Sequence, residues 1–258
     1  MAVDMDGTFL RPDDTYDRPR FARFRERLRE RGGRFVVASG NQYEQLRSFF
    51  DDPDEFGYVS DNGALVADGS EIVHVESLAP EAADRVIAFF EARPEVPFFA
   101  SGPGCAYVPV GVPERLAGVL ARYYHVLRRV RSLYEVRDRL FKFGVEDPRG
   151  LPEGLIAAAR AEIGDVLTPV SSGHGSLDLI IPGCHKAGGL LRLMRRWGIA
   201  PSESAAFGDG GNDIEMLRLC RYSVAMANAP DEVRVAAQHR TAANTEDGVL
   251  VQLDTWFT

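Results

Sequence analysis

The sequence predicts an α/β protein with a Rossmann-like parallel-sheet core and an inserted α+β cap domain. Short apolar runs alternate with helical patterns at the start of the chain, the pattern changes to helices and paired strands after Ser77, and the alternation resumes from Lys186. Strand–helix alternation is typical of a parallel sheet covered by helices, whereas a helix followed by paired strands is typical of an antiparallel α+β module. We therefore assign residues 1–78 and 184–258 to the core and 79–183 to the cap.

The first part of the core contains one segment that needs a decision between two interpretations. Residues 17–31 carry seven Arg against three acidic residues, a balance that also occurs in nucleic-acid patches. Phe21, Phe24 and Leu28 recur there at helical spacing, which indicates an amphipathic helix with a solvated Arg/Glu face. The neighbouring elements are expected to be strands at 2–3, 35–38 and 58–59, a helix at 43–50 and a hairpin at 63–75.

The remaining elements follow from the same periodicities of apolar residues. In the cap we expect helices around 86–90, 116–124 and 152–163, and strands at 96–100, 106–110, 141–143, 166–170 and 176–181. In the second part of the core we expect helices at 190–197, 214–219 and 230–237, and strands at 205–208 and 223–227.

Composition excludes several classes of protein. Of 258 residues 45% are hydrophobic and 26% charged, an ordinary globular balance, and no apolar run approaches the roughly 20 residues of a membrane helix. The N-terminus is too acidic and too short for a signal peptide, so we expect a cytoplasmic protein. A formal charge of −8 argues against nucleic acid and anionic membrane as partners. Only two of the 30 basic residues are lysines, Lys142 and Lys186.

The first chemical signal is the run Asp4-Met5-Asp6-Gly7-Thr8, directly after the first strand. Residues i and i+2 of a strand share a face, so we expect Asp4 and Asp6 to present their carboxylates together. Open α/β sheets bind ligands at this carboxyl edge, and a divalent cation would relieve the repulsion between the two acids. Gly7 allows a sharp turn. The alternative is a turn that carries two exposed acids.

The second signal is Gly208-Asp209-Gly210-Gly211-Asn212-Asp213, which lies between a buried strand and a helix. Glycines permit the backbone to approach an anion closely, and a helix N-terminus favours negative charge. Asp209 and Asp213 add two carboxylates at the same sheet edge, so four acids are expected to converge. A structural turn would explain the glycines but not the acids.

These two motifs, together with Ser39 and Lys186, resemble the four motifs of the haloacid dehalogenase-like phosphohydrolases. Segments 35–43, 62–64 and 224–229 are similar to the Cof-type (subclass IIB) bacterial sugar phosphatases, and the resemblance covers essentially the whole chain.

The spacing of the motifs supports this subclass. The interval from Asp6 to Ser39 has room only for a helix and a return strand, whereas the interval from Ser39 to Lys186 is far longer than the core needs. The insertion therefore lies in the second interval, which is where the Cof-type cap resides.

The resemblance implies a Mg²⁺-dependent phosphatase that hydrolyses small phosphorylated metabolites, sugar phosphates above all, through an aspartyl-phosphate intermediate. Asp4 would be the nucleophile, and Asp6 would be the general acid and base. Mg²⁺ would be held by the Asp4 carboxylate, the Asp6 backbone carbonyl and Asp209. Thr8 would fix the turn.

The resemblance also implies residues that hold the phosphoryl group: Ser39, Gly40, Asn41, Lys186 and Asn212. Lys186 would neutralise the developing charge, and Asp213 would orient it. Ser39 could instead be a turn hydroxyl, and Asp213 could be a helix N-cap, a role that can coexist with orienting Lys186. Asn62 is interpreted as a turn residue only. Asn41 stands where many relatives have Arg, so a cation is missing at that strand end.

The cap is expected to set specificity, with His174 and Lys142 as candidates. His174 could instead be a solvated loop residue, and Lys142 an edge-strand charge that blocks pairing. Two other functions stay open, a phosphomannomutase-like phosphotransferase and a non-catalytic sugar-phosphate-binding protein. In each case the expected partner is a small phosphorylated metabolite, and the expected state is a monomer or weak homodimer.

Overall fold

A computed structural model describes residues 1–147, 149–173 and 176–257, with side chains at all of these except 122, 171–173 and 176. The predicted His174 therefore lies outside the described residues. The contacts divide the chain into two units, each built on its own sheet. Unit 1 comprises Met1–Gly40, Phe50–Val73 and His185–Thr258, and unit 2 comprises Asn41–Phe49 and His74–Cys184. The mixed α/β architecture confirms the predicted fold class.

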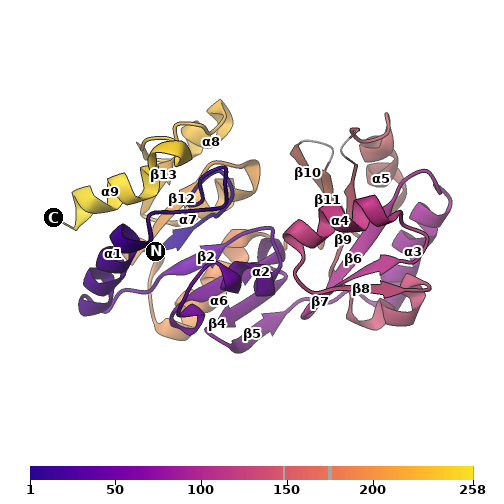
Figure 1. The fold of residues 1–258 in the computed structure, drawn as a ribbon, viewed down its shortest axis with the longest axis horizontal. Coiled ribbons are helices and arrows are strands. Elements are labelled where there is room, and N and C mark those ends of the chain that lie inside the picture. The colour runs from indigo at the N-terminus through magenta and orange to yellow at the C-terminus, as the bar shows by residue number, and fades with distance from the viewer. Residues whose placement is uncertain (148, 174–175, 258) are drawn as a thin grey trace. The chain divides into compact units, whose positions relative to one another are not determined.

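Unit 1 is built on an eight-stranded sheet with the order β14-β13-β12-β1-β2-β3-β4-β5 (Figure 1). The strands are β1 (Ala2–Val3), β2 (Val36–Ala38), β3 (Gly57–Ser60), β4 (Leu65–Asp68), β5 (Glu71–Val75), β12 (Ala205–Gly208), β13 (Tyr222–Ala225) and β14 (His239–Arg240). Pairing is parallel from β14 to β3, and antiparallel between β3 and β4. Because β1 pairs with both β2 and β12, its carboxyl end lies at the centre of the sheet edge.

The helices of unit 1 are α1 (Arg18–Glu30), α6 (Lys186–Trp197), α7 (Ile214–Leu219), α8 (Asp231–Ala236) and α9 (Gly248–Trp256). Helix α6 packs on the sheet through buried Leu190 and Leu193. Gly189 permits this close approach, because a Cβ at that position would lie 2.5 Å from Cγ1 of Val59. The packing fixes the start of α6, and therefore Lys186, against the strands.

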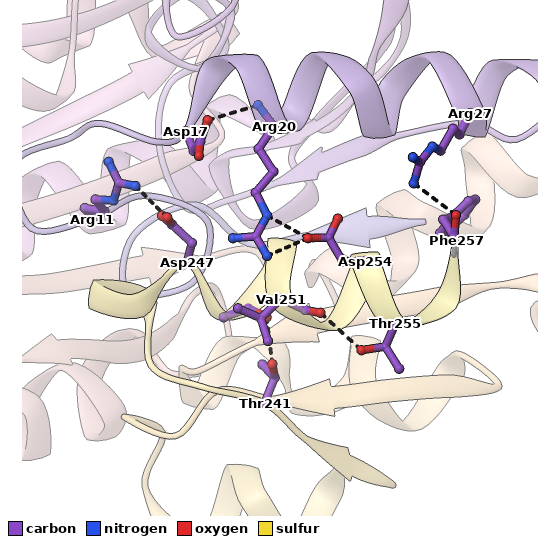
Figure 2. Close-up of polar contacts among 11 residues, drawn as sticks. Arg11, Asp17, Arg20, Arg27, Thr241, Asp247, Val251, Asp254, Thr255 and Phe257 are labelled. Carbon is purple, nitrogen blue, oxygen red and sulfur yellow. Dashed lines mark hydrogen bonds and ion pairs between the residues drawn. The ribbon is translucent and has the colours of Figure 1, made fainter.

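The sequence analysis missed α9, which closes unit 1 beside α1 (Figure 2). Arg20 Nε donates to Asp254 Oδ2 at 2.8 Å, and Arg27 Nη1 donates to the carbonyl of Phe257 at 3.0 Å. On α1 itself Phe21 and Phe24 are buried, as the helical spacing predicted. The Arg-rich face of α1 therefore forms ion pairs and hydrogen bonds within unit 1.

Unit 2 is built on a six-stranded sheet with the order β10-β11-β9-β6-β7-β8. The strands are β6 (Phe98–Gly102), β7 (Cys105–Pro109), β8 (Leu127–Val130), β9 (Lys142–Glu146), β10 (Thr168–Gly173) and β11 (Ser176–Ile180), and the helices are α2 (Tyr43–Ser48), α3 (Pro80–Glu91), α4 (Glu114–Tyr123) and α5 (Leu155–Ile163). The sheet is not wholly antiparallel as expected, because β7 and β8 pair in parallel across the α4 crossover. The sequence analysis missed β8, whose centre is two exposed arginines.

The two faces of the unit 2 sheet are covered by different helices. An apolar cluster that includes Phe90 and Leu155 joins one face to α3 and α5. A smaller cluster that includes Val108 and Leu116 joins the other face to α4.

The edge-strand interpretation of Lys142 is wrong. Lys142 lies on β9, which has β11 on one side and β6 on the other, and its side chain is 1% exposed.

No helix among the described residues is long and apolar enough to cross a membrane.

Candidate active site

The first motif forms a tight turn at the carboxyl end of β1. The N–H of Asp4 still donates to the carbonyl of Phe207 at 3.1 Å, but the carbonyl of Met5 then accepts the N–H of Leu10 at 2.9 Å. The prediction that Asp4 and Asp6 share one strand face is therefore wrong, because β1 ends at Val3. The turn buries Asp4 and leaves Asp6 exposed. Two carboxylates so close in sequence thus have different environments.

Lys186, the first residue of α6, lies between two carboxylates of unit 1. Its Nζ is 2.6 Å from Oδ1 of Asp4 and 2.7 Å from Oδ1 of Asp213, and its side chain is fully buried. Burial by itself would lower the pKa of Lys186, but the charges of Asp213 and Asp4 raise it above the ordinary value. The site therefore holds a fixed positive charge that does not titrate near neutral pH.

Asp213 both pairs with Lys186 and holds the second motif in shape. Its Oδ2 accepts the backbone N–H groups of Asp209 at 3.0 Å and Gly210 at 2.9 Å. Gly208 allows this packing, because a Cβ there would lie 2.5 Å from Cβ of Asp213. Asp213 immediately precedes α7, but its side chain makes no cap hydrogen bond to that helix. Its carboxylate holds Lys186 and the loop of the second motif instead.

Asp209 links the two motifs. Thr8 Oγ1 donates to its Oδ1 at 2.6 Å, and Asn228 Nδ2 is 3.3 Å from its Oδ2 and 2.8 Å from the carbonyl of Gly7. Gly7 has a φ of +77°, and a Cβ there would lie 2.4 Å from Oδ2 of Asp209. Only glycine therefore fits the turn and lets the two loops meet.

Carboxylate oxygens of Asp4, Asp209 and Asp213, which we call the acidic cluster, all lie within 4.8 Å of one another. Burial, and next the charge of Asp213, raise the pKa of Asp4 well above its usual range. Burial also raises the pKa of Asp209 to about 6. Three ionised carboxylates beside one ammonium would leave a net negative charge, which this buried position disfavours.

An oxygen-only cluster of this kind fits a Mg²⁺ ion. Both oxygens of Asp213 already accept hydrogen bonds, from Lys186 and from two backbone N–H groups. Asp4 and Asp209 are the other two carboxylates of the acidic cluster, and they are the ones that the resemblance predicts to hold the cation. Asp6 carries its own carboxylate outward, so its predicted contribution rests on the backbone carbonyl.

The carboxyl ends of β2 and β3 bring further polar groups together. Ser39 follows β2 and is 1% exposed, and its carbonyl accepts the N–H of Asn62 at 3.0 Å. Asn212 Nδ2 donates to Oδ1 of Asn62 at 3.0 Å. A Cβ on Gly40 would lie 3.2 Å from Nδ2 of Asn62, and Asn41 is the first residue of unit 2. The structure thus brings Ser39, Gly40 and Asn212 together around Asn62.

Asn62 and Asn228 are site residues that the sequence analysis underestimated. Asn62 has a φ of +56°, a conformation that Asn adopts more readily than most residues, and its amide connects Asn212 to the end of β2. Asn228 lies after β13 and ties Gly7 to Asp209. Each asparagine follows a strand of the same sheet, a signal that becomes informative only once the strand order is known.

Comparison with known proteins agrees with this geometry. The model of the haloacid dehalogenase-like hydrolase family matches residues 1–253. The chain is 43% identical over 256 residues to the Escherichia coli 5-amino-6-(5-phospho-D-ribitylamino)uracil phosphatase YbjI, covering 98% of this chain and 94% of that protein. It is 26% identical over 281 residues to the Bacillus subtilis phosphatase YitU of the same name, covering 100% and 97%.

A solved structure shows the same fold over almost the whole length. The crystal structure of SMU.1108c from Streptococcus mutans superposes with a TM-score of 0.90 at 38% identity, covering 99% of this chain and 97% of that one. A family match over nearly the whole chain, a relative of 43% identity and this shared fold lead to one conclusion. The chain belongs to the haloacid dehalogenase-like hydrolase family, as one of its phosphatases.

Proposed function

We propose that this protein is a Mg²⁺-dependent phosphatase of a small phosphorylated sugar derivative, and that its substrate is 5-amino-6-(5-phospho-D-ribitylamino)uracil. The observation that carries the proposal is Lys186, fully buried and bound to Asp4 and Asp213 beside a cluster of acids at the sheet edge. Buried charges are expensive, so such an arrangement favours a reaction that uses them. The names of two relatives with full-length matches support the substrate.

Asp4 is the proposed nucleophile. Its carboxylate attacks phosphorus, the bond from phosphorus to the ribityl oxygen breaks, and an aspartyl phosphate forms on Asp4. Asp6, whose side chain is exposed, gives its proton to the departing oxygen. Asp6 then takes a proton from water as the water attacks phosphorus, which releases inorganic phosphate and restores Asp4.

The remaining groups act on the phosphoryl oxygens. Lys186 supplies a permanent positive charge, and Asp213 keeps its ammonium in place. Ser39 and Asn212 donate hydrogen bonds from hydroxyl and amide, with Gly40 and Asn41 beside them. Mg²⁺, held by Asp4, Asp209 and the backbone carbonyl of Asp6, supplies positive charge where the anionic substrate binds.

We further propose that residues 79–183 act as the cap and that the enzyme works in the cytoplasm. A cap would determine which group the phosphate may carry, because the core motifs contact only the phosphoryl group in this mechanism.

Phosphate release from the proposed substrate, measured with Mg²⁺ and with a chelator, tests the function. The Asp4→Asn variant removes the nucleophile and should lose at least about 10³-fold in kcat, since no other group replaces the covalent step. Asp51→Asn is the matched control, because Asp51 is an exposed acid of unit 1. Circular dichroism of both variants confirms folding. An active Asp4→Asn enzyme would contradict the mechanism, and release that requires a bisphosphate activator would instead indicate a phosphotransferase.

A further inference from the structure

The segment 241–248 of unit 1, between β14 and α9, is tightly folded. Thr241 Oγ1 donates to the carbonyl of Gly248 at 2.6 Å, and the N–H of Gly248 donates to the carbonyl of Ala243 at 3.1 Å. Glycine permits this fold, because a Cβ on Gly248 would lie 2.0 Å from the carbonyl oxygen of Ala242. The side chains of this segment therefore project from a well-defined backbone.

Two of these side chains hold the first motif from the other end of the sequence. Asn244 Nδ2 donates to the carbonyl of Leu10 at 2.9 Å, and both residues are buried. Asp247 Oδ2 lies 2.5 Å from Nη2 of Arg11, the next residue along the chain (Figure 2). A buried carbonyl needs a hydrogen-bond partner, and here a distant side chain supplies it.

Asn244 also completes a closed path of hydrogen bonds around the turn. The N–H of Leu10 donates to the carbonyl of Met5 at 2.9 Å, and Asn244 holds the carbonyl of Leu10. The N–H of Asn244 donates to Oδ1 of Asn228 at 3.1 Å, and Nδ2 of Asn228 donates to the carbonyl of Gly7 at 2.8 Å. We call this path the hydrogen-bond ring. It is anchored on either side of one residue.

The residue between the two anchors is Asp6, whose side chain is exposed. Packing therefore restrains it little, and its position depends on the backbone of the turn. By contrast, Asp4 is buried and lies 2.6 Å from Nζ of Lys186. A general acid must lie within hydrogen-bond reach of the leaving oxygen, and a displacement of about 1 Å can cost about 100-fold in rate. A fixed turn supplies the precision that the exposed side chain lacks.

The hydrogen-bond ring requires an amide at position 244. The nitrogen of the Asn244 side chain faces the carbonyl of Leu10. An ionised aspartate has only acceptors, so it would place an oxygen against that carbonyl oxygen and leave both without a donor. Aspartate at 244 would therefore keep the shape of the side chain and break the ring.

We propose that Asn244 is a positioning residue of the phosphatase reaction, which acts through the hydrogen-bond ring to hold Asp6 where it can protonate the leaving oxygen. In that step an oxygen of Asp4 bonds to phosphorus, the bond from phosphorus to the leaving oxygen breaks, and the proton of Asp6 passes to that oxygen. The assignment rests on the proposed function and adds to it the residue that fixes its general acid.

The test compares two phosphate esters of nearly the same shape, phenyl phosphate and p-nitrophenyl phosphate. Nitrophenolate leaves as a far more stable anion than phenolate, so its departure depends much less on a general acid. The readout is the ratio of kcat/KM for phenyl phosphate to kcat/KM for p-nitrophenyl phosphate. We expect this ratio to fall about 10-fold in Asp6→Asn and about 5-fold in Asn244→Ala.

Thr241→Val is the matched control. It removes the hydrogen bond to Gly248 within the same segment but leaves the hydrogen-bond ring intact, so it should keep the wild-type ratio. A general loss of structure would lower kcat/KM equally for both esters, and the ratio would not change.

The double variant Asp6→Asn/Asn244→Ala shows whether Asn244 acts through Asp6. If it does, the double variant should have the ratio of Asp6→Asn alone, because the group that Asn244 positions is already gone. A further 5-fold fall in the double variant would overturn the proposal.

Hydrogen–deuterium exchange tests the ring without catalysis. The peptide that contains residues 4–10 should exchange faster in Asn244→Ala than in the wild type, and at the wild-type rate in Thr241→Val. Asn244→Asp is the second variant if Asn244→Ala does not fold, and thermal unfolding followed by tryptophan fluorescence checks both. Exchange at the wild-type rate in the folded variant would overturn the proposal.

The outcomes separate this proposal from the proposed function. If Asp6→Asn lowers the ratio and the folded Asn244 variant does not, the positioning role fails while the phosphatase mechanism stands. If Asp6→Asn itself leaves the ratio unchanged, Asp6 is not the general acid, and both assignments fail. A lower ratio in both single variants, no further fall in the double variant and faster exchange together support the proposal.

Discussion

Asp213→Asn isolates the charge that holds Lys186 in place. The substitution keeps the shape of the side chain but replaces one carboxylate oxygen by an amide nitrogen that can only donate. Asp213 accepts three hydrogen bonds, from Lys186 Nζ at 2.7 Å and from the N–H groups of Asp209 and Gly210. The single amide oxygen of the substituted side chain cannot satisfy all three donors, so at least one buried donor loses its partner.

The size of the effect follows from this burial. Both Lys186 and Asp213 have fully buried side chains. Removing one partner of a buried ion pair costs about 3–5 kcal/mol, and Asp4 remains to pair with Lys186, so we expect about 3 kcal/mol. For a domain of this size that corresponds to a fall in Tm of roughly 6–12 °C.

The chain offers a direct assay, because both of its tryptophans, Trp197 and Trp256, belong to unit 1. Urea unfolding followed by tryptophan fluorescence therefore reports on the unit that contains the substitution. Asp51→Asn is the control; Asp51 is 84% exposed and pairs with Arg18, so its loss should cost under about 1 kcal/mol. If Asp213→Asn is as stable as this control, Asp213 does not stabilise the buried charge of Lys186, and the reasoning from the geometry is wrong.

Three further substitutions test other parts of the structure. Gly7→Ala should lower kcat sharply, because its Cβ would displace a carboxylate of the acidic cluster, whereas Gly32→Ala, also at positive φ but in open space, should cost only about 1 kcal/mol of stability and no activity. Equal activity of the two variants would contradict this account of the turn. Leu253→Ala should cost about 2–4 kcal/mol in urea unfolding, because Leu253 is 1% exposed, while Val251→Ala on the exposed face of α9 should cost under about 1 kcal/mol. Similar losses would mean that α9 does not pack as described. Hydrogen bonds from the guanidinium and the backbone N–H of Arg149 lower the pKa of Asp147 to about 2. The contribution of Asp147 to folding stability is therefore present above about pH 4 and is lost as pH falls toward 2. Asp147→Asn should therefore be less stable than the wild type at pH 6 by circular dichroism, with a gap that narrows at pH 3; a constant gap would exclude this linkage.

Several elements could be predicted from local patterns because their burial repeats along the chain. The apolar residues of α1 and α6 recur at helical spacing, and the runs at β2 and β12 are buried on both faces. The sequence analysis missed helix α9 because the helix begins at Gly248, a poor helix former, and because its apolar residues are not confined to one face. The sequence analysis missed strand β8 because two arginines interrupt its apolar pattern. The segment is a strand because it pairs with β7, which local sequence does not reveal.

The chemistry of the site divides in the same way. The residue types that gather at the sheet edge could be named from the amino-acid order, because motifs that directly follow parallel strands must meet there. Lys186 could also be identified from the sequence, because it is one of only two lysines in an arginine-rich chain. A lysine presents a compact charge that an arginine fork does not reproduce, and this one lies between two carboxylates.

The different burial and hydrogen bonding of those residues could be known only from the folded chain. The turn after Val3 buries Asp4 and exposes Asp6, and Asp213 holds both Lys186 and the loop of the second motif. Asn62 and Asn228 join the site only because their strands are neighbours of the central strands in the sheet. Likewise, the sequence analysis interpreted Lys142 as an edge-strand charge, but the structure buries it because β9 lies inside its sheet. Burial and hydrogen bonding depend on neighbours that are distant in sequence, so local patterns could name these residues but could not determine their environments.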